Sequence, residues 1–210
     1  MFLLYSNENN IAKKANEIIN NYKNSNREKL KKKFELFHLL VFLEKANLKN
    51  LKIIPNEPGD FIIKNENEKY VIEVTSVFGN KDENIKMKSI LNKIFGVSEE
   101  SKNENEISFD NEVMKKIFLK KITEKEKKDY ISSQKATKSF LLIVTGEFNN
   151  CSITGSWFLK FLRKEELLFK KSFDKVWILD YFASGKDNGP IIIKDFYNEF
   201  IEYKNIYSKK

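Results

Sequence analysis

Two acidic residues in neighbouring apolar segments are the residues of this chain best placed to do chemistry. Asp60 directly precedes the apolar run 61–64, and Glu73 lies inside the apolar run 70–74. If the two runs form a hairpin centred between residues 66 and 67, the two acids lie opposite each other on one face, with Cβ atoms about 4.5–5.5 Å apart. Carboxylates this close repel each other unless a cation or a proton lies between them. The spacing therefore predicts a cation site.

The chemistry of the two acids indicates which cation this would be. Hard oxygen ligands that are few and leave positions for water and phosphate suit Mg²⁺ or Mn²⁺ better than zinc. Each acid also has a simpler interpretation: Glu73 could face solvent on an alternating strand, and Asp60 could be a turn residue after Pro58-Gly59. Because an unpaired charge inside an apolar strand is costly, the pair in register favours the metal site.

Helices and strands must position these acids, and their expected order can be taken from the apolar pattern. Apolar residues at helical spacing predict helices over 11–22 and 27–46. Runs rich in Ile, Val, Phe and Tyr, separated by turn residues or polar stretches, then predict three strands over 51–54, 61–64 and 69–77.

The second half of the chain is expected to alternate between helices and strands. The charged segment 78–105 is weakly patterned and could contain one short helix. Further expected elements are a helix over 110–134, a buried strand over 140–144, a helix over 156–168, a strand over 175–182, a Gly-rich turn over 184–189 and a strand over 191–193. This order predicts an α/β fold with a mixed central sheet flanked by helices.

The same residues carry a resemblance to a known family. The chain resembles the PD-(D/E)XK nuclease superfamily, which has the restriction-endonuclease-like fold. That superfamily is similar in placing one acid at the start of a strand, a second acid on the next strand with a lysine two residues later, and helices before and after. Asp60 matches the first acid and Glu73 the second, whereas Thr75 stands at the lysine position. The resemblance covers residues 34–144 and implies an αβββαβ core.

The resemblance also implies a set of metal ligands. Several members of the superfamily supply a further glutamate from the helix before the strands, and Glu35 occupies that place. Glu35 could instead pair with Lys31 or Lys32 within the helix. The implied ligands of Mg²⁺ or Mn²⁺ are Asp60, Glu73, the Val74 carbonyl and Glu35.

Replacements for the missing lysine must come from elsewhere in the chain. In this superfamily the lysine helps to activate the attacking water and to stabilise developing phosphate charge. Lys121 and Lys125 follow Ile117 at helical spacing and could reach the site, although both also belong to the charged run 120–128. Thr75 is a candidate to position the water through its hydroxyl. The candidates for nucleic-acid contact are Lys128, Gln134 and Lys138.

Composition excludes several other classes of protein. A chain of 210 residues with 41% hydrophobic residues suits one domain, 1–210, with a helical addition over 1–25, a core over 26–146 and a C-terminal elaboration over 147–210. No apolar run approaches the roughly 20 residues that span a bilayer, and the first residues lack the basic segment of a secretory signal. The single cysteine, Cys151, excludes an internal disulfide framework. We therefore expect a soluble, cytoplasmic protein with no membrane association.

The charged and nucleophilic residues narrow the function further. With His38 as the single histidine, a Ser/His or Cys/His mechanism is improbable, and His38 lies among apolar residues that are typical of a core. The net charge of +8 favours an anionic partner. Almost all of it is lysine, however, and lysine lacks the bidentate fork of arginine. The charge alone does not identify nucleic acid as that partner.

These observations lead to one expected function and two alternatives. We expect a metal-dependent nuclease, an endonuclease that hydrolyses phosphodiester bonds of DNA or RNA in restriction, defence or mobile-element biology. The first alternative is a catalytically inactive protein of the same fold that acts as a nucleic-acid-binding or protein-inhibitory module, which Thr75 favours. The second is a protein-interaction component of such a system. Nucleic acid is the expected partner, and a homodimer or a protein partner is left open.

Overall fold

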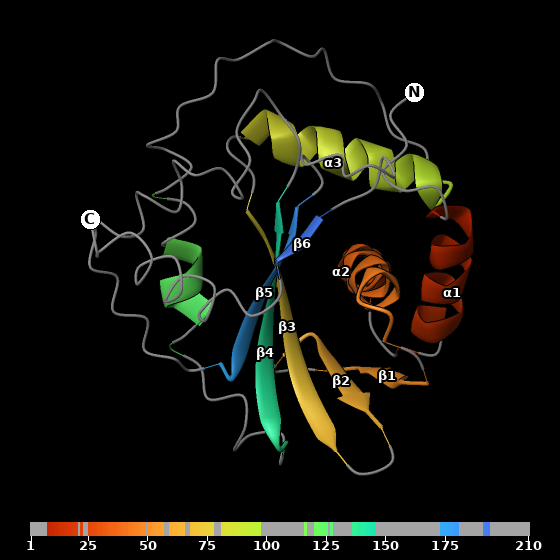
Figure 1. Cartoon of the computed structure of the whole chain (residues 1–210). Coiled ribbons are helices and arrows are strands. Elements are labelled where there is room, and N and C mark those ends of the chain that lie inside the picture. The colour runs from red at the N-terminus through yellow and green to blue at the C-terminus, as the bar shows by residue number, and fades with distance from the viewer. Residues whose placement is uncertain are drawn as a thin grey trace.

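The chain folds around a mixed β-sheet with helices on both sides (Figure 1). The structure is a computed structural model. It describes residues 8–20, 22, 25–48, 50–56, 59–65, 68–77, 81–97, 116, 120–125, 127, 136–145, 173–180 and 191–193. The mixed α/β class predicted from the sequence is therefore confirmed.

Two helices precede the sheet. Helix α1 spans Glu8–Asn20 and α2 spans Asn26–Lys45, close to the predicted 11–22 and 27–46. A capping box fixes the start of α2: the Ser25 hydroxyl accepts from the Glu28 N–H at 3.3 Å, and the Glu28 carboxylate accepts from the Ser25 N–H at 3.2 Å. The capping box thus explains why α2 begins at Asn26.

The sheet has six strands in sequential order. They are β1 (Lys52–Pro55), β2 (Phe61–Lys64), β3 (Lys69–Val77), β4 (Lys138–Thr145), β5 (Lys175–Asp180) and β6 (Ile191–Ile193). Strands β1, β2 and β3 form an antiparallel meander, β3, β4 and β5 are parallel, and β6 is antiparallel to β5. The first strand lies one residue later than predicted, and β4 is longer than the predicted 140–144, because its ladder extends into polar residues at both ends.

The register of β2 and β3 is the one predicted from the sequence. Phe61 pairs with Ile72 and Lys64 pairs with Lys69. Continued by one position, this register places Asp60 beside Glu73. The two acids therefore stand at the same level of the sheet.

The sheet is covered on both faces by different parts of the chain. One face packs on α1 and α2 through side chains that include Ile72, Val74 and Phe140, and Figure 1 shows both helices on that side. The helical segment 120–125, in green, lies on the opposite side. Its Ile122 is buried, as are Val71 and Leu141 of the sheet. Each face of β3 thus meets a helix.

The charged segment after β3 forms a longer helix than the short one expected there. Helix α3 spans Lys81–Ile94 and lies across the upper end of the sheet in Figure 1. It is followed by Phe95, whose ring lies 5.9 Å from Phe34 and 6.1 Å from Phe37 of α2. The segment is therefore packed on the core of the protein.

Several predictions concern residues outside the described part of the chain. These include most of the helix expected over 110–134, the helix over 156–168 and the turn over 184–189, together with Cys151. Among the described residues, no helix combines the length and apolar character needed to cross a membrane.

Candidate active site

Asp60 is held where β1, β2 and β3 meet. Gly59 before it has a φ of 82°, which glycine adopts without strain, and the Asn56 N–H donates to the Asp60 carbonyl at 3.0 Å. The Asp60 Oδ2 accepts from the Val74 N–H at 2.8 Å, and its Oδ1 accepts from Lys32 Nζ at 2.6 Å. The buried Asp60 carboxylate therefore ties the start of β2 to the middle of β3 and to α2.

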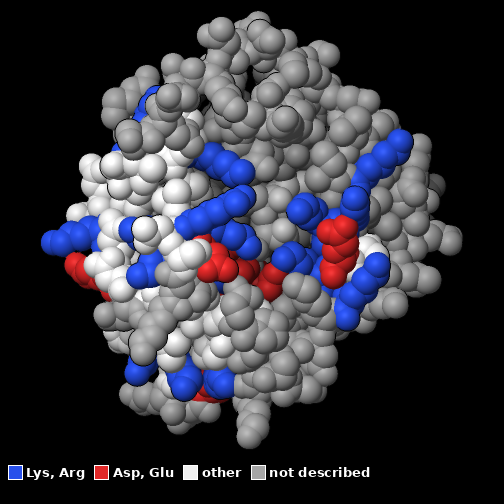
Figure 2. Space-filling model, turned by 180° about the vertical axis from the view of Figure 1, so that it is seen from behind, with Lys and Arg blue, Asp and Glu red and all other residues white. Residues whose placement is uncertain are grey.

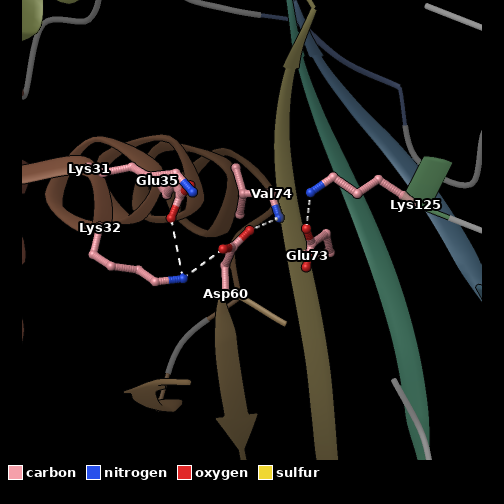
Figure 3. Close-up of polar contacts among 7 residues, drawn as sticks. All are labelled: Lys31, Lys32, Glu35, Asp60, Glu73, Val74 and Lys125. Atoms are coloured by element: carbon pink, nitrogen blue, oxygen red, sulfur yellow. Dashed lines mark hydrogen bonds and ion pairs between the residues drawn. The ribbon is translucent and has the colours of Figure 1, made fainter. Parts of the chain in front are cut away.

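Helix α2 brings two lysines and a glutamate to Asp60. Lys32 Nζ also lies 3.4 Å from Glu35 Oε2, and Lys31 Nζ lies 3.3 Å from Glu35 Oε1. Lys32 is 3% exposed, and its ammonium lies 5.4 Å from the centre of the Phe61 ring. Figure 3 shows this ammonium between the carboxylates of Asp60 and Glu35. The alternative prediction, that Glu35 pairs with Lys31 or Lys32, is confirmed for both lysines.

The surroundings of Glu35 change the pKa of its carboxyl group. Burial, followed by the nearby Asp60 carboxylate, raises the pKa of Glu35 to about 7, and Lys32 and Lys31 oppose this rise. The Glu35 carboxylate in turn raises the pKa of Lys31. Within the described part of the chain, Glu35 Oε2 is buried and accepts no hydrogen bond. Glu35 is thus able to hold a proton near neutral pH.

Glu73 lies on β3 and meets a lysine from another element. Glu73 is 3% exposed, and its Oε1 accepts from Lys125 Nζ of the helical segment 120–125. Figure 3 shows Lys125 reaching Glu73 from the side of β3 opposite to α2. Lys121 of the same segment is half-buried. Of the two lysines selected from the sequence, the structure therefore brings Lys125 to the second acid.

The two acids share the predicted level of the sheet but turn to different partners. Asp60 contacts α2, whereas Glu73 contacts Lys125. Asp60 lies in a bend before β2, so its side chain does not follow the alternation of that strand. Among the described residues, no group of three or more His, Cys, Asp or Glu side chains is placed to hold a metal ion. Lysine ammonium groups balance the charge for which the sequence predicts a metal ion.

The ion pair between Lys32 and Asp60 was not predicted from the sequence. A signal for it was present, because Lys32 continues the helical stripe of the buried Leu36, Leu39 and Leu43. A lysine on such a stripe is buried at a cost unless an acid meets it. That acid is Asp60, 28 residues further along the chain.

Two of the other candidate site residues lie in the sheet, and two lie outside the described residues. Thr75 is buried, two residues beyond Glu73 on β3. Lys138, at the start of β4, lies over the Tyr70 ring and is 3.6 Å from Glu68. Lys128 and Gln134 lie outside the described residues.

His38 is a core residue, as expected from its apolar neighbours. Its ring is buried and meets the Phe37 ring edge-on, with centroids 5.8 Å apart. Burial lowers the pKa of His38 to about 3. His38 is therefore neutral at physiological pH and carries no charge toward the site.

Acidic and basic side chains lie close together on the side of the molecule shown in Figure 2. There, Asp and Glu side chains lie near the middle of the face, and Lys and Arg side chains lie on both sides of them. Basic side chains placed in this way raise the local concentration of anions.

Comparison with family models, curated proteins and solved structures finds no match to this chain. The function must therefore be argued from the site.

Proposed function

We propose that this protein is a metal-dependent nuclease of the PD-(D/E)XK kind. The observation that carries the proposal is that three acids with little access to water each contact a lysine near the middle of β3: Glu35 and Asp60 on the α2 side, and Glu73 on the other side. Such carboxylates must each be compensated, so three of them in one region are rare unless they serve a site. The order of α2, the β1–β3 meander, the helical segment 120–125 and β4 supports an αβββαβ core.

The oxygen donors suit a hard divalent cation. Asp60, Glu73, the Val74 carbonyl and Glu35 are the ligands that we propose for Mg²⁺ or Mn²⁺, and the Glu35 oxygen without a hydrogen bond supports this choice. Because Asp60 and Glu73 turn to opposite sides of β3, binding of one ion would require their side chains to leave their lysine partners and turn toward each other. When bound, the metal would lower the pKa of a coordinated water and neutralise charge on the phosphate. Lys32 now balances Asp60 and Glu35, so a metal ion at these acids would compete with its ammonium.

Lys125 is our candidate for the lysine that is absent at position 75. It contacts the second acid, Glu73, from the helical segment 120–125. An ammonium there would stabilise negative charge on a phosphate in the transition state. Thr75, on the same face of β3, would position a water through its hydroxyl, and Lys121 would add positive charge nearby.

A cleavage assay with matched variants tests the proposal. Single- and double-stranded DNA and RNA are incubated with the protein in Mg²⁺, Mn²⁺ or EDTA. Asp60→Asn and Glu73→Gln, which keep side-chain size, should lower the cleavage rate at least about 100-fold. The control is Glu124→Gln, an exposed acid on the segment that carries Lys125, which should cleave as the wild type does. Equal cleavage by all three variants would overturn the proposal.

A second candidate is an inactive protein of the same fold that binds nucleic acid or inhibits a protein. The pairing of each acid with a lysine and Thr75 at the lysine position favour it. Binding of nucleic acid in EDTA, with no cleavage in any divalent metal, would support this candidate. Absence of any affinity at low salt would favour a protein partner. A homodimer is compatible with each of these functions and is tested by the mass of the protein in solution.

A further inference from the structure

The ammonium group of Lys32 lies where two carboxylates from different parts of the chain converge (Figure 3). Lys32 Nζ is 2.6 Å from Asp60 Oδ1 and 3.4 Å from Glu35 Oε2. Asp60 precedes β2, whereas Glu35 lies on α2, so the convergence depends on how the helix packs against the sheet. A cation therefore already lies between two of the acids that we propose as metal ligands.

This ammonium compensates the two acids unequally. Both oxygens of Asp60 accept hydrogen bonds, one from Lys32 and one from the Val74 N–H. Among the residues that the structure describes, Glu35 Oε2 is buried and accepts none, and a buried acceptor without a donor costs free energy. Because an ammonium carries one positive charge and a divalent ion carries two, a divalent ion would attract both carboxylates more strongly.

Lys32 reaches this place from inside the protein. Its side chain is 4% exposed, and its ammonium also lies 5.4 Å from the centre of the Phe61 ring. Lys32 continues the helical stripe of the buried Leu36 and Leu39, so its apolar stem is held in the core. Two cations at one carboxylate repel each other. Close contact of a metal ion with Asp60 therefore requires the Lys32 ammonium to withdraw.

We propose that Lys32 inhibits the binding of divalent cations at Asp60 and Glu35, because its own ammonium holds the place that such a cation would take. This inference deepens the proposed function and rests on it, since it takes the cation from there. If Lys32 is solely the counterion of acids that never bind a metal, its removal should lower stability without any gain in metal affinity. If Lys32 competes with a metal ion, its removal should strengthen metal binding.

Mn²⁺ binding measured by electron paramagnetic resonance tests the inference. Lys32→Met and Lys32→Gln remove the ammonium and should bind Mn²⁺ at least about 10-fold more tightly than the wild type, because the acids remain without the repelling charge. Lys32→Arg keeps the positive charge and should bind Mn²⁺ as weakly as the wild type.

The matched control is Lys31→Met. Lys31 also contacts Glu35, but its side chain is 72% exposed. Because water screens an exposed charge, this variant should change the Mn²⁺ affinity by less than about 5-fold.

A double variant locates the tighter binding. Lys32→Met/Asp60→Asn has neither charge of the pair and should lose the gain in Mn²⁺ affinity that Lys32→Met shows. Thermal unfolding gives a second measure, because an ion that binds the folded protein raises its Tm. Mn²⁺ should therefore raise the Tm of Lys32→Met more than that of the wild type. If Lys32→Met is unfolded without metal, Lys32→Gln, whose amide can still donate to Asp60, takes its place in both measurements.

The outcomes for Lys32 and for the nuclease are distinguishable. Equal Mn²⁺ affinity in Lys32→Gln, Lys31→Met and the wild type would overturn the inference, as would a gain in affinity that persists in the double variant. If the Lys32 variants bind Mn²⁺ more tightly while no form of the protein cleaves nucleic acid, the nuclease proposal fails and the role of Lys32 stands. If the wild type cleaves with Mg²⁺ or Mn²⁺ and the Lys32 variants gain no affinity, the nuclease proposal stands and the inference fails.

Discussion

The two acid–lysine pairs of the candidate site lie on opposite sides of β3 and differ in their access to water. In the pair on the α2 side, the Lys32 side chain is 4% exposed and the Asp60 side chain 8%. In the other pair, the Glu73 side chain is 4% exposed, whereas the Lys125 side chain is 22% exposed. The ion pair on the α2 side is thus buried at both residues, whereas in the other pair the lysine is open to solvent.

This difference indicates different roles for the two lysines. Lys32 is fixed by Asp60, by Glu35 and by the Phe61 ring, so moving it would leave the buried Asp60 carboxylate without its lysine. In the proposed nuclease, Lys125 would exchange Glu73 for an incoming phosphate at lower cost, because water can reach its ammonium. The α2 side would then hold the site together, and the Lys125 side would meet the proposed substrate.

The largest effect that the comparison predicts is the loss of stability in Lys32→Met. Methionine keeps much of the volume but leaves Asp60 buried without its cation, which for a buried ion pair costs about 3–5 kcal/mol. The free energy of unfolding is measured by urea denaturation at neutral pH. Lys31→Met is the matched control on the neighbouring position, where the lysine side chain is 72% exposed, and it should change stability by less than about 1 kcal/mol. An equal loss of unfolding free energy in both variants would contradict the role of Lys32 as the buried partner of Asp60.

The second prediction concerns pH and again belongs to the α2 side. The pKa of Glu35 is raised from 4.5 to about 7, chiefly by burial and by Asp60, against the opposing effects of Lys32 and Lys31. Between these values the folded protein keeps the proton and the unfolded chain releases it. Stability should therefore fall as pH rises from about 4.5 to 7, by at most about 3 kcal/mol.

The comparison with Glu35→Gln isolates this contribution to the pH dependence. Urea denaturation at several pH values should show a smaller fall in this variant than in the wild type, because glutamine does not titrate. Glu44→Gln, an exposed acid on the same helix, should keep the wild-type slope. A slope in Glu35→Gln that equals that of the wild type would show that another group is responsible.

The local sequence pattern was sufficient to predict β2 and β3 and the placement of Asp60 beside Glu73 in the sheet. Turn residues precede the run at β2 and a polar stretch separates it from the run at β3, and the predicted bounds 61–64 and 69–77 are confirmed. A turn centred between the two runs then fixes the register, which places Asp60 beside Glu73. These features depend on neighbours in sequence, and the sequence pattern therefore contains them.

The partners of the acids depend on how helices pack on the sheet, which no local pattern specifies. Lys32 meets an acid 28 residues away, and Lys125 meets one 52 residues away. Lys121 and Lys125 are four residues apart, share one side of the helical segment and are both half-buried. The ion pair of Lys125 with Glu73, which depends on how the segment packs on β3, distinguishes two lysines that looked equivalent in sequence.

The smallest expected change in stability comes from the open side, in Lys125→Gln. Because its lysine is partly exposed, loss of the pair should cost about 1–2 kcal/mol, less than Lys32→Met. If Lys125 stabilises a phosphate in the transition state, the cleavage rate should nevertheless fall about 100-fold. Lys120→Gln on the same segment, where the lysine side chain is 77% exposed, is the control and should change both quantities little.

A double-mutant cycle separates the structural part of this effect from the catalytic part. Adding Glu73→Gln to Lys125→Gln replaces both charges, so the double variant should regain part of the stability lost in Lys125→Gln. It should not regain cleavage, because both the ammonium of Lys125 and the proposed metal ligand Glu73 are absent. Stability and cleavage that recover together would contradict the roles proposed for Glu73 and for Lys125 in cleavage.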